Sequence, residues 1–149
     1  MSTGSVSPDT TVVLRPRVVR VAGYAIGAVV LAASVLCAVL IPGFSLFDRT
    51  GFVAVGLAAL LFCHREASVR VIAEADRLIV RNMFATHELA WPQVVGMAFP
   101  KGDPWAHLDL ADGTTLPTNA LQRADGDYGV DLARQLVALV RQRGEAHEA

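Results

Sequence analysis

Two polar side chains in the second half of the chain, His107 and Asp109, stand two residues apart and have the chemistry of metal ligands. On a β-strand this spacing would place both on one face. A zinc site needs at least three protein ligands, and no third His or Cys lies close to them in the sequence. Asp112-Gly113 has the composition of a turn and lacks the ligand spacing of a calcium loop. We therefore predict no metal site and no cofactor.

Nucleophilic and phosphate-binding chemistry have no better support in the sequence. Serine, histidine and aspartate are present, but no Gly-x-Ser-x-Gly elbow positions a nucleophile. The loop Pro100-Lys-Gly-Asp lacks the glycine-rich approach to a helix that cradles phosphate. We predict no catalytic residue and expect that the protein is not an enzyme.

Aromatic and basic residues are the stronger candidates for binding. Trp91 and Trp105 each neighbour a proline at the boundary of an expected strand, and Lys101 lies in the loop before Trp105. Aromatic rings beside basic side chains are typical of protein interfaces. The alternative is that each ring fills the core, which the sequence favours for Trp91 and leaves open for Trp105. The candidate partner-binding residues are Trp105, Lys101 and Trp91.

The composition places part of the chain in lipid. Of 149 residues, 53% are hydrophobic and 18% are charged, and the mean hydropathy is +0.43. A soluble domain of this size rarely has so apolar a composition. The net charge of −1 gives no excess of positive charge for binding nucleic acid. Two cysteines are too few for a disulfide framework.

Two apolar runs predict a helical hairpin that spans a membrane. Residues 21–41 carry no charge, and a helix of this length crosses the ~30 Å hydrocarbon core. Pro42-Gly43 ends this run, and a shorter apolar segment follows, which predicts a second span at about 48–64. The alternative for the second run is a buried or re-entrant helix, which would place the rest of the chain on the opposite side. A cleaved signal peptide fits less well, because the first run is too long and no small-residue cleavage site closes it.

Basic residues flank the hairpin on both sides and set its orientation. Positive residues stay on the cytoplasmic side of a membrane protein, so we predict an inner-membrane protein with both termini in the cytoplasm. The candidate membrane-surface contacts are Arg15, Arg17, Arg20, Arg65 and Arg70. Within the first span, the small residues Gly23, Gly27 and Ser34 let another helix approach closely. They would pack against the second span or against another protein.

Beyond residue 65 the pattern changes to short alternating strands and a final helix. The expected strands are 68–73, 78–80, 84–89, 93–99, 105–110 and 114–116. The helix covers about 128–142, with an apolar stripe at Leu132, Ala133, Leu136, Val137 and Val140. Arg134, Arg141 and Arg143 are expected on its exposed face or near its C-terminal dipole. This order predicts a pleckstrin-homology (PH)-like antiparallel sandwich or barrel capped by a C-terminal helix, an α+β fold.

The chain resembles the small actinobacterial PH-domain membrane proteins, grouped with the low molecular weight protein antigen 6 PH domain. The resemblance lies in the segments Val69–Ala73, Leu78–Asn82, Leu89–Gly96, Phe99–Gly102, Pro104–Ala106 and Leu108–Thr114. The resemblance implies a membrane-anchored PH-like domain and brings no established catalytic activity or ligand. Phosphoinositide binding would need a basic first hairpin. Here Ala73–Arg77 holds two carboxylates beside one arginine, which departs from that pattern.

The sequence therefore predicts four parts: a disordered lead (1–14), the hairpin (15–65), the PH-like domain (66–143) and a flexible tail (144–149). We expect residues 66–149 to fold without the hairpin. The predicted function is a membrane-anchored cytoplasmic interaction module in contact with the lipid bilayer, which docks a protein partner and no nucleic acid. The alternative is a sensor of lipid headgroups or small ligands at the membrane surface.

Overall fold

The computed structural model describes residues 10–148, with the backbone alone from 145 on. The chain forms two compact units. One unit is the pair of helices in Arg17–Ser68, and the other combines the segment ending at Pro16 with the segment beginning at Val69. The helical unit is thus inserted between the first and second strands of the strand-containing unit.

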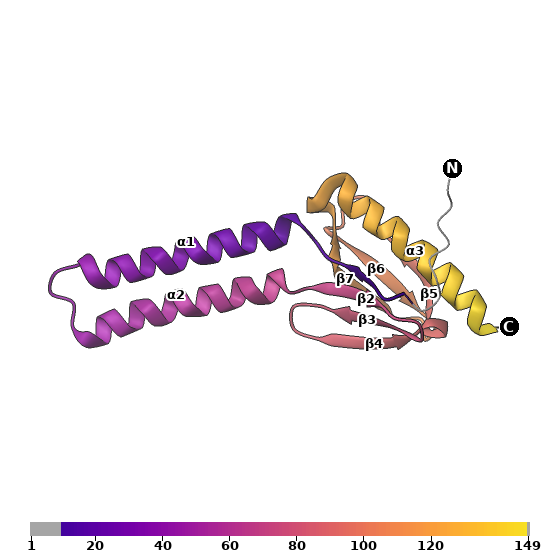
Figure 1. Ribbon diagram of the computed structural model, residues 1–149, viewed down its shortest axis with the longest axis horizontal. Coiled ribbons are helices and arrows are strands. Elements are labelled where there is room, and N and C mark those ends of the chain that lie inside the picture. Colours follow the sequence, from indigo (N-terminus) through magenta and orange to yellow (C-terminus); the bar gives the residue numbers. More distant parts are fainter. Residues whose placement is uncertain (1–9, 149) are drawn as a thin grey trace. The chain divides into compact units, whose positions relative to one another are not determined.

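The helical unit consists of α1 (Val18–Leu40) and α2 (Leu46–Ala67), joined by a short turn (Figure 1). Gly43 has a φ of +83° in this turn, a conformation that favours glycine. Ser45 and Asp48 form a capping box at the start of α2, in which each side chain accepts a hydrogen bond from the other's backbone N–H. This cap starts α2 earlier than the predicted second span. With 22 residues, α2 is about 33 Å long.

Small residues bring the two helices close together. A Cβ atom added to Gly27 would lie 3.2 Å from the Cβ of Cys63, and one added to Gly56 would lie 2.8 Å from the Cβ of Ser34. A Cβ on Gly23 would lie 3.3 Å from the carbonyl oxygen of Cys63. The small-residue face of α1 is therefore used within the hairpin itself.

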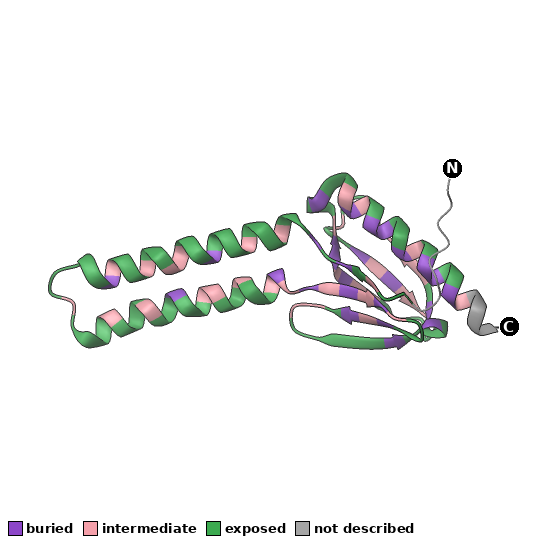
Figure 2. Cartoon of the chain, in the orientation of Figure 1, coloured by how far each residue is buried: buried purple, intermediate pink, exposed green. Residues whose placement is uncertain are grey.

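Most of the surface of both helices is exposed, as the green colour in Figure 2 shows. Many of the exposed side chains are large and apolar. Both helices are long and apolar enough to cross a membrane. In a soluble helix pair these valine, leucine and phenylalanine side chains would need a covering surface.

The first sheet has four antiparallel strands in the order β1-β2-β3-β4. Their bounds are Val12–Leu14 (β1), Arg70–Ala73 (β2), Arg77–Arg81 (β3) and Thr86–Ala90 (β4). Strand β1 precedes the helical unit and pairs with β2, which follows it, so that Leu14 lies opposite Val71. The two chain connections to the hairpin therefore leave from neighbouring strands.

The second sheet has three antiparallel strands in the order β5-β6-β7. Their bounds are Val94–Ala98 (β5), Trp105–Leu110 (β6) and Thr115–Gln122 (β7). A 3-10 turn at Trp91–Gln93 separates β4 from β5. Asn82, just after β3, bridges to β7 by donating to the carbonyl of Pro117 at 2.6 Å and accepting from the backbone N–H of Asn119 at 3.0 Å.

Helix α3 (Gly126–Glu148) packs over the two sheets and closes one shared core (Figure 1). The alternating strand residues and one stripe of α3 are buried together in this core. Its largest fully buried side chains include Trp91, Leu14, Leu78, Leu108, Leu121 and Leu136.

Three details correct the sequence predictions. The lead over 1–14 is not wholly disordered, because Val12–Leu14 form β1; residues 1–9 lie outside the described part. The sheets form no closed barrel among the described residues, since the turn at Trp91–Gln93 interrupts the pairing. The predicted tail at 144–149 continues α3 as far as Glu148.

Candidate functional site

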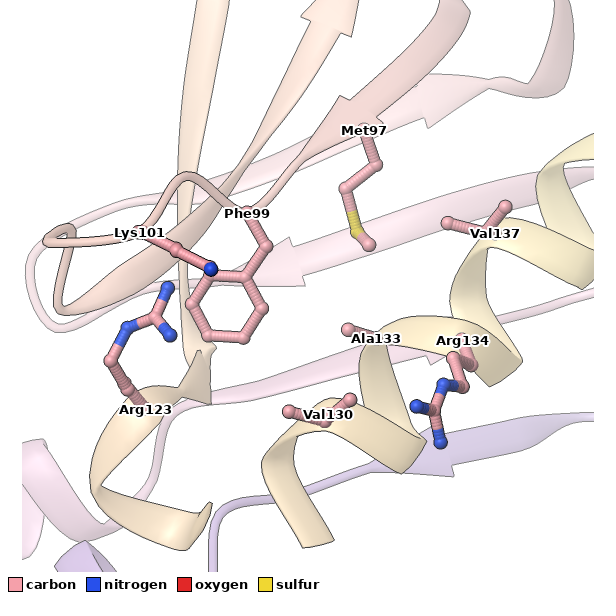
Figure 3. Close-up of a pocket in the computed structure, with 8 residues that line it drawn as sticks. All are labelled: Met97, Phe99, Lys101, Arg123, Val130, Ala133, Arg134 and Val137. Carbon is pink, nitrogen blue, oxygen red and sulfur yellow. The ribbon is translucent and has the colours of Figure 1, made fainter. Parts of the chain in front are cut away.

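A groove of about 490 Å³ lies between the end of β5 and α3 (Figure 3). Met97 and Phe99 form one wall, because side chains two residues apart along an extended chain point to the same side. Val130, Ala133 and Val137 form the other wall, because residues spaced by three, four and seven share one face of a helix. The volume is in the range of protein sites that hold small ligands or side chains.

Arg123 lies at one end of this groove and is held by backbone atoms and an aromatic ring. Its guanidinium carbon lies 4.7 Å from the centre of the Phe99 ring, a cation–π arrangement. It donates to the carbonyls of Pro100 at 2.5 Å and Asp103 at 3.1 Å. These acceptors carry no formal charge, and no ion pair joins Arg123 to a carboxylate of the described residues.

Two further basic side chains line the groove. Arg134 forms an exposed ion pair with Asp131, with 2.9 Å between nitrogen and oxygen. Lys101 is exposed and makes no ion pair with a described carboxylate. The groove therefore has apolar walls and a positive rim. On this rim Lys101 and Arg123 make no ion pair with a described carboxylate.

Strand β5 is the edge of the second sheet beside this groove. It pairs with β6 along one side, and no other described strand pairs with its outer side. Val95 on this strand is 64% exposed. An unpaired strand edge presents backbone N–H and C=O groups that an added strand can pair with.

Trp91 has no exposed surface for a partner, with a relative exposure of 0%. Its indole N–H donates to the carbonyl of Glu74 at 3.2 Å. Arg143 was expected on the exposed face of the helix or near its C-terminal dipole; the first of these is wrong, because Arg143 is 5% exposed. Its guanidinium lies 5.3 Å from the Trp91 ring centre and donates to the carbonyls of Glu74 and Thr10. Together, the contacts of Trp91 and Arg143 attach α3 and the start of the described chain to the first sheet.

Of the other two candidate partner-binding residues, one lines the groove and the other does not. Lys101 lines the groove. Trp105 opens β6 opposite Gln122, is 36% exposed and is not among the groove residues. The structure thus brings one of the three candidates to the groove.

The turn between β2 and β3 is acidic. Arg77 lies within 3.1 to 3.4 Å of the carboxylates of Asp76, Glu88 and Glu74. Hydrogen bonds to Asp76 and then Glu88 are the largest causes that raise the pKa of the Arg77 guanidinium. With its charge taken up by three carboxylates, this turn does not form a phosphate cradle.

His107 and Asp109 do not act as a pair. The imidazole of His107 instead lies 3.2 Å from the Asp103 carboxylate. Within the described residues, no group of three His, Cys, Asp or Glu side chains is arranged to hold a metal ion.

The five arginines proposed to contact the membrane surface divide between the two units. Arg17, Arg20 and Arg65 are exposed on the helical unit. Arg15 is exposed after β1, and Arg70 is half-buried opposite Arg81 at the start of β2.

Fold and groove together define a PH-like domain with an open sheet edge, carried on an apolar helical hairpin. The chain belongs to the bacterial PH domain family, whose model matches residues 68–141. It is 34% identical over 146 residues to "Uncharacterized protein Mb1452" of Mycobacterium bovis and to "Uncharacterized protein Rv1417" of Mycobacterium tuberculosis. Each alignment covers 89% of this chain and 92% of the relative. No solved structure is significantly similar.

The groove was missed in the sequence, although one signal pointed toward it. The stripe that α3 buries in the core includes Leu132, Leu136 and Leu139. Val130 and Val137 lie beside this stripe and widen the apolar arc beyond what the core covers. When the apolar arc of a helix is wider than the core beneath it, some apolar side chains stay uncovered, and these form a second surface.

Proposed function

We propose that the protein is a membrane-anchored, non-catalytic docking module, whose PH-like domain holds a protein partner at the cytoplasmic face of the inner membrane. The apolar groove beside the open edge of β5 is the observation that carries the docking role. The family is typically non-catalytic, and the described residues hold no cluster of metal ligands.

The pairing of β1 with β2 supports two complete spans. These strands flank the hairpin in the sequence and are hydrogen-bonded neighbours in one sheet. A single span would separate these strands by the thickness of the membrane, so their pairing favours an even number of crossings. An even number of crossings keeps both on one side, and the arginines that flank the hairpin favour the cytoplasm.

This topology predicts the behaviour of reporter fusions. A reporter that is active only outside the cytoplasm is expected to stay silent when fused after Val140. The same reporter inserted in the turn at Gly43 is expected to be active. Activity after Val140 would contradict the proposed orientation.

Crosslinking in cells tests the docking role. A photoreactive amino acid at Val137 faces the groove, whereas one at Gln135 is exposed on the opposite face of the same helix. We expect protein adducts from position 137, their loss when Val130→Glu is added, and few adducts from position 135. Equal adducts at both positions would contradict docking through the groove.

The alternative, a sensor of lipid headgroups, has less support. The β2–β3 turn pairs its one arginine with three carboxylates. The groove is lined mainly by apolar side chains, and its three basic residues, Lys101, Arg123 and Arg134, are exposed at the rim, where water weakens their hold on a phosphate group.

A further inference from the structure

The groove and the open strand edge belong to one surface, and their chemistry restricts what fits there. We propose that the occupant is an extended, acidic segment of a partner protein. This segment pairs with β5 as an added strand, places an apolar side chain between β5 and α3, and directs carboxylates to Lys101 and Arg123. This inference rests on the proposed function, because it names the kind of partner that the docking module holds.

The backbone of β5 argues for an extended segment. Its outer side has no strand partner among the described residues. Its register with β6 shifts between Val94 and Gly96, so the regular edge runs from Gly96 to Ala98 and on towards Phe99. Pairing of an extended peptide with an open edge supplies main-chain hydrogen bonds, while alternate side chains enter neighbouring pockets. The groove that begins at Met97 and Phe99 is such a pocket.

The apolar walls argue for an anchoring side chain. Met97, Phe99, Val130 and Val137 are all half-buried, so each retains apolar surface that an added side chain would cover. Burying apolar surface at the centre of a contact, with polar groups around it, is the arrangement of binding hot spots.

The charges argue for acidic flanking residues. Arg123 is held in place by the Phe99 ring and two carbonyl groups, and its charge is not neutralised by them. The nearest carboxylate in this loop, on Asp103, lies against His107. Lys101 adds a second positive charge from the loop after β5. A basic segment would meet two like charges here, whereas an acidic one gains charge-assisted hydrogen bonds.

Peptide binding to the full-length protein in detergent micelles tests this inference. The first probe is a fluorescent hexapeptide of alternating glutamate and leucine. The second replaces glutamate by lysine, and the third keeps glutamate but carries N-methyl groups on alternate amides, which remove the donors for strand pairing. We expect the acidic peptide to bind about tenfold or more tightly than either of the others, and to weaken as salt is added.

A charge swap identifies the surface. Lys101→Glu is expected to weaken binding of the acidic peptide and to strengthen binding of the lysine peptide. Each affinity is expected to change by about tenfold or less. Arg81→Glu makes the same change in charge on an exposed position of β3, in the other sheet and outside the groove, and is expected to leave both affinities nearly unchanged. Thermal melts of both variants confirm that they are folded.

Several results would overturn the inference. Equal binding of the acidic and lysine peptides would remove the charge argument, and equal binding of the N-methylated peptide would remove strand addition. Competition by phosphatidylglycerol vesicles would make the groove a lipid site. Loss of peptide binding as the protein dimerises would assign it to a second copy. If the peptides fail but position 137 still crosslinks to protein, the occupant is wrong and the docking role stands; if both fail, the proposed function fails too.

Discussion

Residues 66–149 alone are expected to be about 2–4 kcal/mol less stable than a chain in which residues 10–16 are joined to residue 69 by a short Gly-Ser linker. The shorter chain loses β1, and with it Leu14, which is 1% exposed in the core opposite Val71. Burial of one leucine contributes about 1.5–3 kcal/mol, and the β1 backbone bonds add to it. It also loses the bond from Arg143 to the Thr10 carbonyl.

Urea unfolding of the two chains, followed by circular dichroism, measures this difference. The linker is feasible because β1 and β2 are antiparallel neighbours whose ends meet at the hairpin. Leu14→Ala in the linked chain is the matched control and is expected to cost about 2–5 kcal/mol. Equal unfolding midpoints for the long and short chains would show that β1 adds nothing. The structure thus changes the sequence-based expectation that 66–149 is the complete folding unit.

Leu136→Asp is expected to unfold the PH-like domain. Leu136 is 0% exposed at the centre of the α3 stripe, and a carboxylate there would lie in an apolar core without a partner. Uncompensated burial of a charge is among the few single changes that cost more than about 4 kcal/mol, which is comparable to the whole stability of a domain of this size.

The matched control for this variant is Gln135→Asp, the same new side chain on an exposed position of the same helix. We expect it to change the unfolding free energy by about 0.5 kcal/mol or less. A cooperative thermal melt of the linked domain carrying Leu136→Asp would contradict the assigned core. It would mean that α3 does not close the sheets.

Most of the fold follows from local patterns in the sequence. The uncharged run predicted α1, and the stripe around Leu136 predicted α3. The alternation of Val69 and Val71 with Arg70 predicted β2, and the apolar run 78–80 predicted β3. Strand β1 was not predicted, because a segment of three residues is too short to show the two-residue alternation of a strand. Its partner β2 lies beyond two helices, so nothing local to Val12–Leu14 marks them as a strand.

The site was less predictable, because it depends on which faces remain uncovered. Lys101 was predicted to contact a partner because it lies in the loop before Trp105, and it lines the groove. Arg143 was expected on the exposed face of the helix or near its C-terminal dipole, but its guanidinium lies in the interior, against the Trp91 ring and the carbonyls of Thr10 and Glu74. These partners come from three distant parts of the chain. Such a pairing is set by tertiary structure alone.

Because β1 precedes the hairpin and β2 follows it, membrane insertion and folding of the first sheet have to occur in a fixed order. About 55 residues separate Leu14 from its partner strand, so at synthesis rates of about 5–20 residues per second β1 waits about 3–10 s for β2 to emerge from the ribosome. In the proposed topology, β1 and β2 meet only after both helices have been inserted. A chain that inserts one helix alone leaves these strands on opposite sides of the bilayer, with Leu14 uncovered and the first sheet incomplete. Failed insertion therefore lowers the stability of the domain and raises its unfolded fraction, which proteases can recognise and remove.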